Sequence, residues 1–164
     1  MTIDQIISLV SIIFGGVISA FVVSGLSNRR DLKDYKRKKF EELYELIRAD
    51  GISFFDWYIR YFAVFDGSIS AKDIQKKEIS ITEGPDRKTK AEMLSSLYAP
   101  EVTNKIHAYW KEKQALVLLI NDAEQNMRKS SSLPDMQKLH SCRQSVENSR
   151  QEVLKEIAKL SKRL

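Results

Sequence analysis

Hydrophobic and polar positions divide the chain into two parts. Every residue from Gln5 to Asn28 is uncharged, a run of 24 residues. After Asn28, apolar residues recur at spacings of three and four with charged residues between them, which is typical of amphipathic helices. The pattern therefore predicts one apolar helix followed by several amphipathic ones.

The apolar run is long enough to cross a membrane. As a helix it would extend about 36 Å, against roughly 30 Å of hydrocarbon. Residues 1–4 contain no Lys or Arg, which argues against a cleaved signal peptide. Because basic flanks stay in the cytoplasm, the basic residues after Asn28 predict a single-pass membrane protein with its N-terminus outside and its C-terminus cytoplasmic.

Small and hydroxylated residues are concentrated within this run. A helical projection places five residues in an arc roughly 80° wide, and we predict that they line a pore or pack helices together: Asp4, Ser8, Ser11, Gly15 and Ser19. A neighbouring face carries Gly16, Ala20, Ser24 and Ser27. Two such faces suit a homo-oligomer, with Asp4 at the outer mouth of a pore. A single dimer contact or a contact with a partner protein explains the same composition.

The rest of the chain is predicted to be helical. The spacing of apolar residues and the breaks at Gly and Pro predict helices over Asp31–Ala49, Ser53–Asp66, Lys90–Tyr98, Pro100–Lys129 and Asp135–Lys162. A short helix at Ala71–Lys77 and a weak strand candidate at Glu78–Ile81 lie in the polar stretch between them. We expect the first helix to stop before Gly51 and the transmembrane helix to continue into it.

These elements predict an all-α protein. Its expected architecture is one N-terminal transmembrane helix followed by a cytoplasmic helical bundle with two long antiparallel helices. The expected domains are residues 1–28, the transmembrane helix; 29–50, a basic juxtamembrane helix; and 51–164, the cytoplasmic bundle.

The positive charge is confined to one short segment. The net charge is −1 over residues 1–28, +5 over residues 29–39 and +1 over residues 40–164, which sums to the total of +5. The basic residues of that segment are Arg29, Arg30, Lys33, Lys36, Arg37, Lys38 and Lys39. Their position beside the apolar run weakens the inference from a pI near 9.2 to nucleic-acid binding. It also suits a module that recruits anionic lipid at a membrane surface.

Two sets of residues are candidates for ligand binding. A basic cluster near a turn, which could receive phosphates, consists of Lys76, Lys77, Arg87, Lys88 and Lys90. Trp57 and Arg60 could form a stacking platform for a nucleobase. A solvated loop face is the simpler explanation of the first set, and an aromatic core helix is that of the second.

Catalytic motifs are missing from the sequence. The chain has two histidines, His107 and His140, on different predicted helices, one cysteine, Cys142, and no Gly-rich phosphate loop. No metal-ligand spacing is visible. We therefore predict a protein that is not an enzyme and that has no cofactor and no metal site.

The layout resembles a known group of proteins. A Ser- and Gly-containing span at Gln5–Asn28, a basic stop at Arg29–Lys39 and a helical domain after it resemble the small single-span membrane effectors of bacterial antiphage defence operons, such as the membrane components of Hailong, retron and CBASS-type systems. The resemblance implies a homo-oligomer whose membrane helices form a pore that is gated by a nucleotide or oligonucleotide signal or by a cytoplasmic partner protein. The competing expectation is a non-conducting membrane anchor or adaptor that presents its bundle to a partner.

Overall fold

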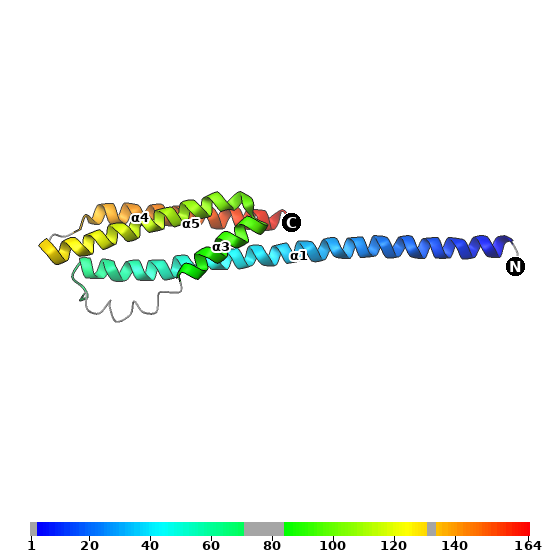
Figure 1. The fold of residues 1–164 in the computed structure, drawn as a ribbon, viewed down its shortest axis with the longest axis horizontal. Helices are drawn as coiled ribbons and strands as arrows, with labels where there is room; N and C mark the ends of the chain where they lie inside the picture. Colours follow the sequence, from blue (N-terminus) through cyan, green and yellow to red (C-terminus); the bar gives the residue numbers. More distant parts are fainter. Residues whose placement is uncertain (1–2, 71–83, 131–133) are drawn as a thin grey trace. The chain divides into compact units, whose positions relative to one another are not determined.

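The structure, a computed structural model, describes residues 3–70, 84–130 and 134–164; for residues 3–23, 84–86, 128 and 130 it describes the backbone alone. The helices are α1 (Ile3–Phe65), α3 (Gly84–Tyr98), α4 (Pro100–Ser130) and α5 (Met136–Lys162) (Figure 1). The described residues contain no β-strand. The predicted all-α fold class is therefore confirmed for this part of the chain.

Several predictions concern residues outside this description. They are the helix at Ala71–Lys77, the strand candidate at Glu78–Ile81, the side chains of Lys76 and Lys77, and those of Asp4, Ser8, Ser11, Gly15 and Ser19. They remain predictions.

The chain divides into two compact units, residues 1–38 and residues 39–164. Helix α1 contributes to both, because it continues without a break from Ile3 to Phe65. In the first unit, the described side chains, those of residues 24–38, are all exposed. The second unit is a helical bundle with its own core. The predicted continuation of the apolar helix into the segment that follows it is confirmed.

None of the helices in the part of the chain with described side chains has a stretch apolar enough to cross a membrane. Most of the predicted span, residues 5–28, lies outside that part.

Helices α4, of 31 residues, and α5, of 27 residues, pack against each other. They run antiparallel (Figure 1). Helix α5 begins where Asp135 caps it: the Asp135 carboxylate accepts a hydrogen bond of 3.0 Å from the backbone N–H of Lys138. The bounds of both helices lie within one residue of the prediction.

The core of the bundle is made by the apolar stripes seen in the sequence. Leu43 and Ile47 of α1 are fully buried, together with Ile106, Leu116 and Ile120 of α4. Helix α5 adds Leu139, Val146, Val153 and Ile157 to the same cluster. Four aromatic residues of α1 belong to it as well, since Phe54, Tyr58, Tyr61 and Phe65 are buried. Burial of one stripe from each helix explains why the spacing predicted these elements.

The expected helix end before Gly51 is wrong. Gly51 is a buried residue within α1, and a Cβ added there would lie 2.3 Å from the Cδ atom of Arg150. Gly51 therefore allows the close approach of an α5 side chain. The glycine that does end α1 is Gly67, which follows Phe65 with a φ of +82°. Such a left-handed residue after a helix is favourable for glycine because it has no Cβ.

Helix α3 begins earlier than expected. We predicted a helix from Lys90, whereas α3 starts at Gly84. Pro85 then occupies the first turn, where a missing backbone N–H leaves no helical hydrogen bond unmade. Proline marks the start of this helix rather than an interruption before it.

Candidate functional site

The most distinctive polar feature of the bundle is a buried cluster of Asp50, Tyr109 and Lys113, which we call the Asp50 cluster. Asp50 of α1 is only 3% exposed. The Tyr109 hydroxyl donates a hydrogen bond of 2.6 Å to its Oδ2 atom. The Lys113 ammonium donates to both carboxylate oxygens, at 2.7 and 2.8 Å. The cluster therefore joins α1 to α4 through a charged pair in which Asp50 is buried and Lys113 is partly buried.

Helical spacing explains how the cluster forms. Asp50 follows Ile47 by three residues and precedes Phe54 by four, so it occupies the buried stripe of α1. Lys113 follows Tyr109 by four residues, so both side chains emerge from one face of α4. Asp50 and Lys113 are thus charged residues at positions of apolar stripes, where they meet each other.

Aromatic rings enclose the Lys113 ammonium. Its Nζ atom lies 4.5 Å from the centroid of the Trp110 ring and 5.0 Å from that of Phe54. Burial lowers the pKa of Lys113, and the Asp50 carboxylate opposes that shift. Burial and the neighbouring Asp50 both raise the pKa of Tyr109, so its hydroxyl keeps its proton and remains a donor.

Helix α5 meets the same turn of α1. The Arg150 side chain lies against Gly51, and its guanidinium is 5.8 Å from the centroid of the Phe55 ring. Glu147 accepts two hydrogen bonds from Arg150, at 2.6 and 2.9 Å. These bonds raise the pKa of Arg150. One turn of α1, at Asp50 and Gly51, is therefore held by polar side chains from both α4 and α5.

Arg87, one of the predicted ligand-binding residues, lies close enough to the Asp50 cluster for its charge to act on Lys113. Its Nη1 atom donates a hydrogen bond of 2.9 Å to the Ser53 hydroxyl of α1, and its charge contributes to lowering the pKa of Lys113. Lys90 instead forms an ion pair with Glu42, at 2.9 Å. Lys88 lies 3.9 Å from Glu92 on its own helix. The three described members of the predicted basic cluster therefore have different neighbours.

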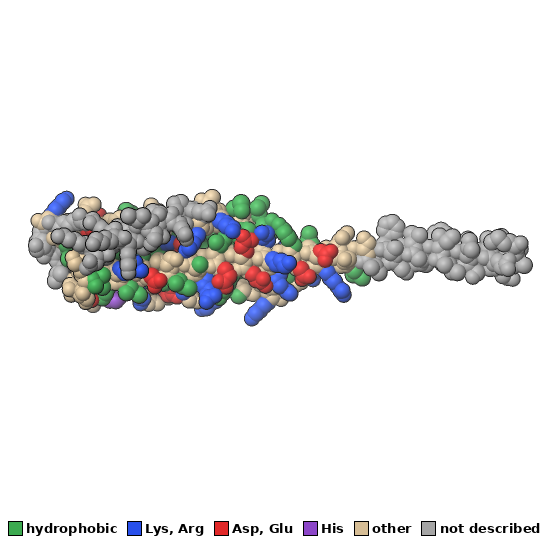
Figure 2. All heavy atoms as spheres, turned by 90° about the horizontal axis from the view of Figure 1, so that it is seen from below, with side chains coloured by type: hydrophobic (Ala, Val, Ile, Leu, Met, Phe, Trp, Pro, Cys, Tyr) green, Lys and Arg blue, Asp and Glu red, His purple; other side chains and the backbone are tan. Residues whose placement is uncertain are grey.

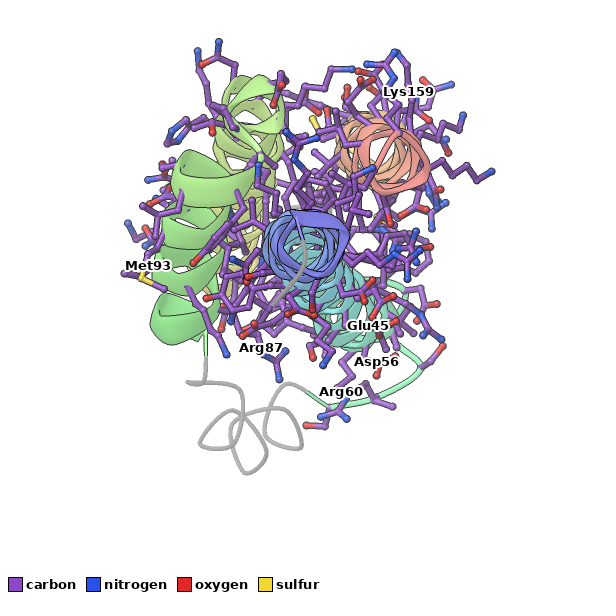
Figure 3. All side chains as sticks on the ribbon, turned by 90° about the vertical axis from the view of Figure 1, so that its right-hand side faces the viewer. Glu45, Asp56, Arg60, Arg87, Met93 and Lys159 are labelled. Carbon is purple, nitrogen blue, oxygen red and sulfur yellow. The ribbon has the colours of Figure 1, made fainter. Side chains whose placement is uncertain are left out.

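Trp57 and Arg60 lie on α1. The Trp57 ring is half-buried and stacks on Phe54, with centroids 5.5 Å apart, and contacts Tyr61 at 4.8 Å. Packing against core aromatic residues accounts for the position of Trp57, in agreement with the alternative expectation of an aromatic core helix. In Figure 3, Arg60 and Asp56 point outward from the bundle.

The basic residues that follow Asn28 are exposed, except Lys39. Arg29, Arg30, Lys33, Lys36, Arg37 and Lys38 belong to the fully exposed stretch of α1. Lys39, at the first position of the bundle, forms an ion pair of 2.8 Å with Glu42. On the face seen in Figure 2, Lys and Arg side chains lie among Asp and Glu side chains.

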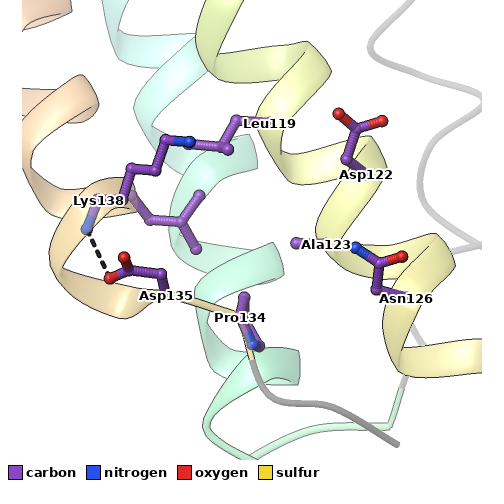
Figure 4. A pocket seen from close by; sticks show the side chains of 8 residues that line it. Leu119, Asp122, Ala123, Asn126, Pro134, Asp135 and Lys138 are labelled. Carbon is purple, nitrogen blue, oxygen red and sulfur yellow. Dashed lines mark hydrogen bonds between the residues drawn. The ribbon is translucent and has the colours of Figure 1, made fainter. Parts of the chain in front are cut away.

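A hollow of about 260 Å³ lies beside the connection between α4 and α5. Asp122 and Asn126 of α4 line it together with Asp135 and Lys138 (Figure 4). The Asp135 carboxylate is already engaged in capping α5. Among the described residues, no group of three His, Cys, Asp or Glu side chains is arranged to hold a metal ion.

Sequence reasoning missed the Asp50 cluster, although the signal was present. Tyr109 continues the apolar stripe of Val102 and Ile106 along α4, and Lys113 interrupts that stripe. A charged residue on the buried stripe of one helix is stabilised when an opposite charge on another helix pairs with it. Asp50 occupies such a position on α1.

Comparison with protein-family models, curated proteins and solved structures found no match to this chain.

Proposed function

We propose that the chain is a homo-oligomeric membrane effector. Residues 5–28 cross the bacterial inner membrane once, and residues from 29 onward are cytoplasmic. Copies associate through the small-residue faces of the span, and the stripe from Asp4 to Ser19 lines a gated pore. The uncharged run of 24 residues and the basic segment that follows it support this orientation.

The observation that carries the proposal is the continuity of α1. One helix, Ile3–Phe65, contains both the apolar run and Asp50, the residue that fixes this helix to α4 in the bundle. A buried ion pair on an apolar stripe selects one register between two helices. The bundle therefore acts as the controlling element: a signal that changes how α1 packs against α4 changes the state of the pore.

The trigger in this proposal is a nucleotide or oligonucleotide signal or a cytoplasmic partner protein. Arg87 is the favoured contact for a phosphate, since it neighbours the Asp50 cluster. The resemblance in layout to antiphage effectors supports a role in bacterial defence.

Membrane potential tests the pore. We expect bacteria expressing the full chain to depolarise when the effector is active, and a chain with a poly-Leu span of equal length to leave the potential unchanged. Gly15→Leu with Ser19→Leu should also abolish depolarisation, because larger side chains fill the proposed pore stripe. The matched control is Val10→Leu with Val17→Leu, outside both small-residue faces. Depolarisation that survives the poly-Leu replacement would rule out the pore.

An anchor or adaptor is the second candidate function. Met93 and Leu97 of α3, four residues apart on one face, are 52% and 65% exposed. Met93 points away from the other helices in Figure 3. An exposed apolar pair on one helix favours a partner protein. If the chain is an adaptor, its activity should survive the poly-Leu span and be lost with Met93→Ser and Leu97→Ser. If it is a pore without a partner, its activity should be lost with the poly-Leu span and survive Met93→Ser and Leu97→Ser.

A further inference from the structure

The first unit carries a one-sided arrangement of positive charge. With 100° between successive residues of α1, five side chains fall within an arc of about 120°, and we call them the basic face: Arg29, Arg30, Lys33, Lys36 and Arg37. Asp31 and Asp34 project outside this arc. All five basic side chains are exposed. The acidic residues of the segment are therefore separated from most of its basic residues around the helix.

The positive charges of the basic face are not neutralised by any carboxylate whose side chain the structure describes. Among the residues with described side chains, none of these five forms an ion pair with a carboxylate, whereas the neighbouring Lys39 is paired with Glu42 at 2.8 Å. Exposed cations packed this closely repel one another, and a multivalent or repeated anionic ligand relieves that repulsion.

We propose that the basic face binds the phosphate groups of anionic phospholipids. This inference rests on the proposed span, residues 5–28, which places Arg29 at the end of the hydrocarbon region. Arg29 to Arg37 covers about 12 Å along the helix, and the polar layer on each side of a bilayer is about 5–7 Å thick. Arg29, Arg30 and Lys33 therefore reach the phosphates directly.

The outer part of the basic face acts at longer range. Lys36 and Arg37 lie roughly 10–12 Å beyond the end of the hydrocarbon region. This is about 3–7 Å outside the polar layer, within one screening length of about 8–10 Å. Arg29 and Arg30 form forked hydrogen bonds to phosphate, while Lys33 contributes a point charge. The contributions to lipid binding should therefore decline from Arg29 towards Arg37.

A nucleic acid offers the same phosphate chemistry but fits the segment less well. Binding of single strands combines basic side chains with aromatic ones on which bases stack. Within residues 24–38, Tyr35 is the one aromatic residue, and its position falls outside the arc of the basic face. The net charge of +5 is also confined to residues 29–39, directly after the apolar run.

Lipid selectivity measured on the full chain tests this inference. The chain is reconstituted in phosphatidylcholine vesicles containing spin-labelled phosphatidylglycerol or spin-labelled phosphatidylcholine. Electron spin resonance then gives the fraction of each label immobilised by the protein. Because a basic residue near an anionic surface changes association by up to about fivefold, we expect a severalfold preference for phosphatidylglycerol that falls as salt is raised.

Two matched sets of variants locate the interaction. Arg29→Gln, Arg30→Gln and Lys33→Gln together should bring the ratio of the two lipids close to one, and Lys36→Gln with Arg37→Gln should reduce it less. Lys111→Gln, Lys129→Gln and Lys155→Gln remove the same charge from exposed positions of the bundle. This control should retain the preference.

The outcomes separate this inference from the proposed function. If the chain resists carbonate extraction but shows no preference for phosphatidylglycerol, the lipid interaction is overturned and the proposed span is not. The same holds if both triple variants show the same preference. Retention of single-stranded RNA by such a chain would favour nucleic acid instead and would equally overturn it. A chain that carbonate releases from the vesicles overturns the proposed span, and this inference with it.

Discussion

Lysine and arginine side chains have different surroundings in the two units of the chain. In the bundle, the partly buried Lys113 is bonded to the buried carboxylate of Asp50, and Arg150 is bonded twice to Glu147. In the first unit, the basic face is exposed and has no carboxylate partner among the described residues. The same residue types therefore specify helix packing in one unit and remain available to an external anion in the other.

The physical reason for the difference is desolvation. An ion pair inside a core loses its hydration, so it stabilises the fold only when its geometry is complementary and both partners are present. An exposed cation keeps its hydration and contributes little to stability, but it contributes to the attraction of distant anions. Replacing a charged side chain by an apolar one should therefore change the free energy of unfolding much more in the bundle than in the first unit.

The largest expected effect comes from removing Lys113. Lys113→Met leaves the Asp50 carboxylate buried without its counterion, which should lower the free energy of unfolding by about 3–5 kcal/mol. Urea unfolding of the full chain in detergent, followed by the fluorescence of Trp57 and Trp110, measures it. Lys33→Met makes the same exchange on the basic face and should change stability by less than about 0.5 kcal/mol. Equal effects of the two variants would contradict the comparison.

A double variant tests whether the stability lost in Lys113→Met is due to the unpaired charge of Asp50. Asp50→Leu with Lys113→Met removes both charges and should recover most of the stability lost in Lys113→Met, because an apolar pair fits the core. Failure to recover would mean that the Lys113 side chain matters through its packing on Phe54 and Trp110 rather than through its charge.

Gly51→Ala should have an intermediate effect. The new methyl group would lie 2.3 Å from the Cδ atom of Arg150, so Arg150 must move and weaken its contacts with Phe55 and Glu147. We expect a loss of about 1–3 kcal/mol in thermal or urea unfolding. The control is Gly25→Ala in the first unit, where nothing lies within 4 Å of the added Cβ. Adding Arg150→Ala should relieve the clash, and a persistent loss would exclude it as the cause.

The smallest expected effect comes from Glu42, which pairs with Lys39 at 2.8 Å and Lys90 at 2.9 Å near the surface. Hydrogen bonds from Lys39, then from Lys90, lower the pKa of Glu42. Its contribution is therefore present above the unfolded pKa, about 4.3, and is lost as the pH falls through the lower folded value. Glu42→Gln should cost less than about 1 kcal/mol at pH 7.

The pH and salt dependence provide the check on Glu42. The difference in unfolding free energy between the native chain and Glu42→Gln should shrink as the pH falls below about 4. It should also shrink at high salt, because the ion pairs are partly exposed. A difference that stays constant with pH would mean that the glutamine variant perturbs packing instead.

The bounds of α4 and α5 could be predicted closely because local spacing encodes them. The stripes Leu43–Ile47 and Val102–Ile106 follow the period of a helix, and the bounds of α4 and α5 matched to within one residue. The two glycines of α1 show the limit of local reasoning. Gly67 ends the helix through its positive φ, whereas Gly51 lies inside it because a side chain of α5 needs the space.

The sequence by itself determined the helical class, the stripes that form the core, the uncharged run and the confinement of positive charge to residues 29–39, because each depends on order along the chain. Only the tertiary structure decided that Asp50 meets Lys113 and Tyr109, that Arg150 covers Gly51, and that Arg87 reaches Ser53. These contacts join residues 34 to about 100 positions apart. Their partners are chosen by how the helices pack, which periodicity within one helix does not encode.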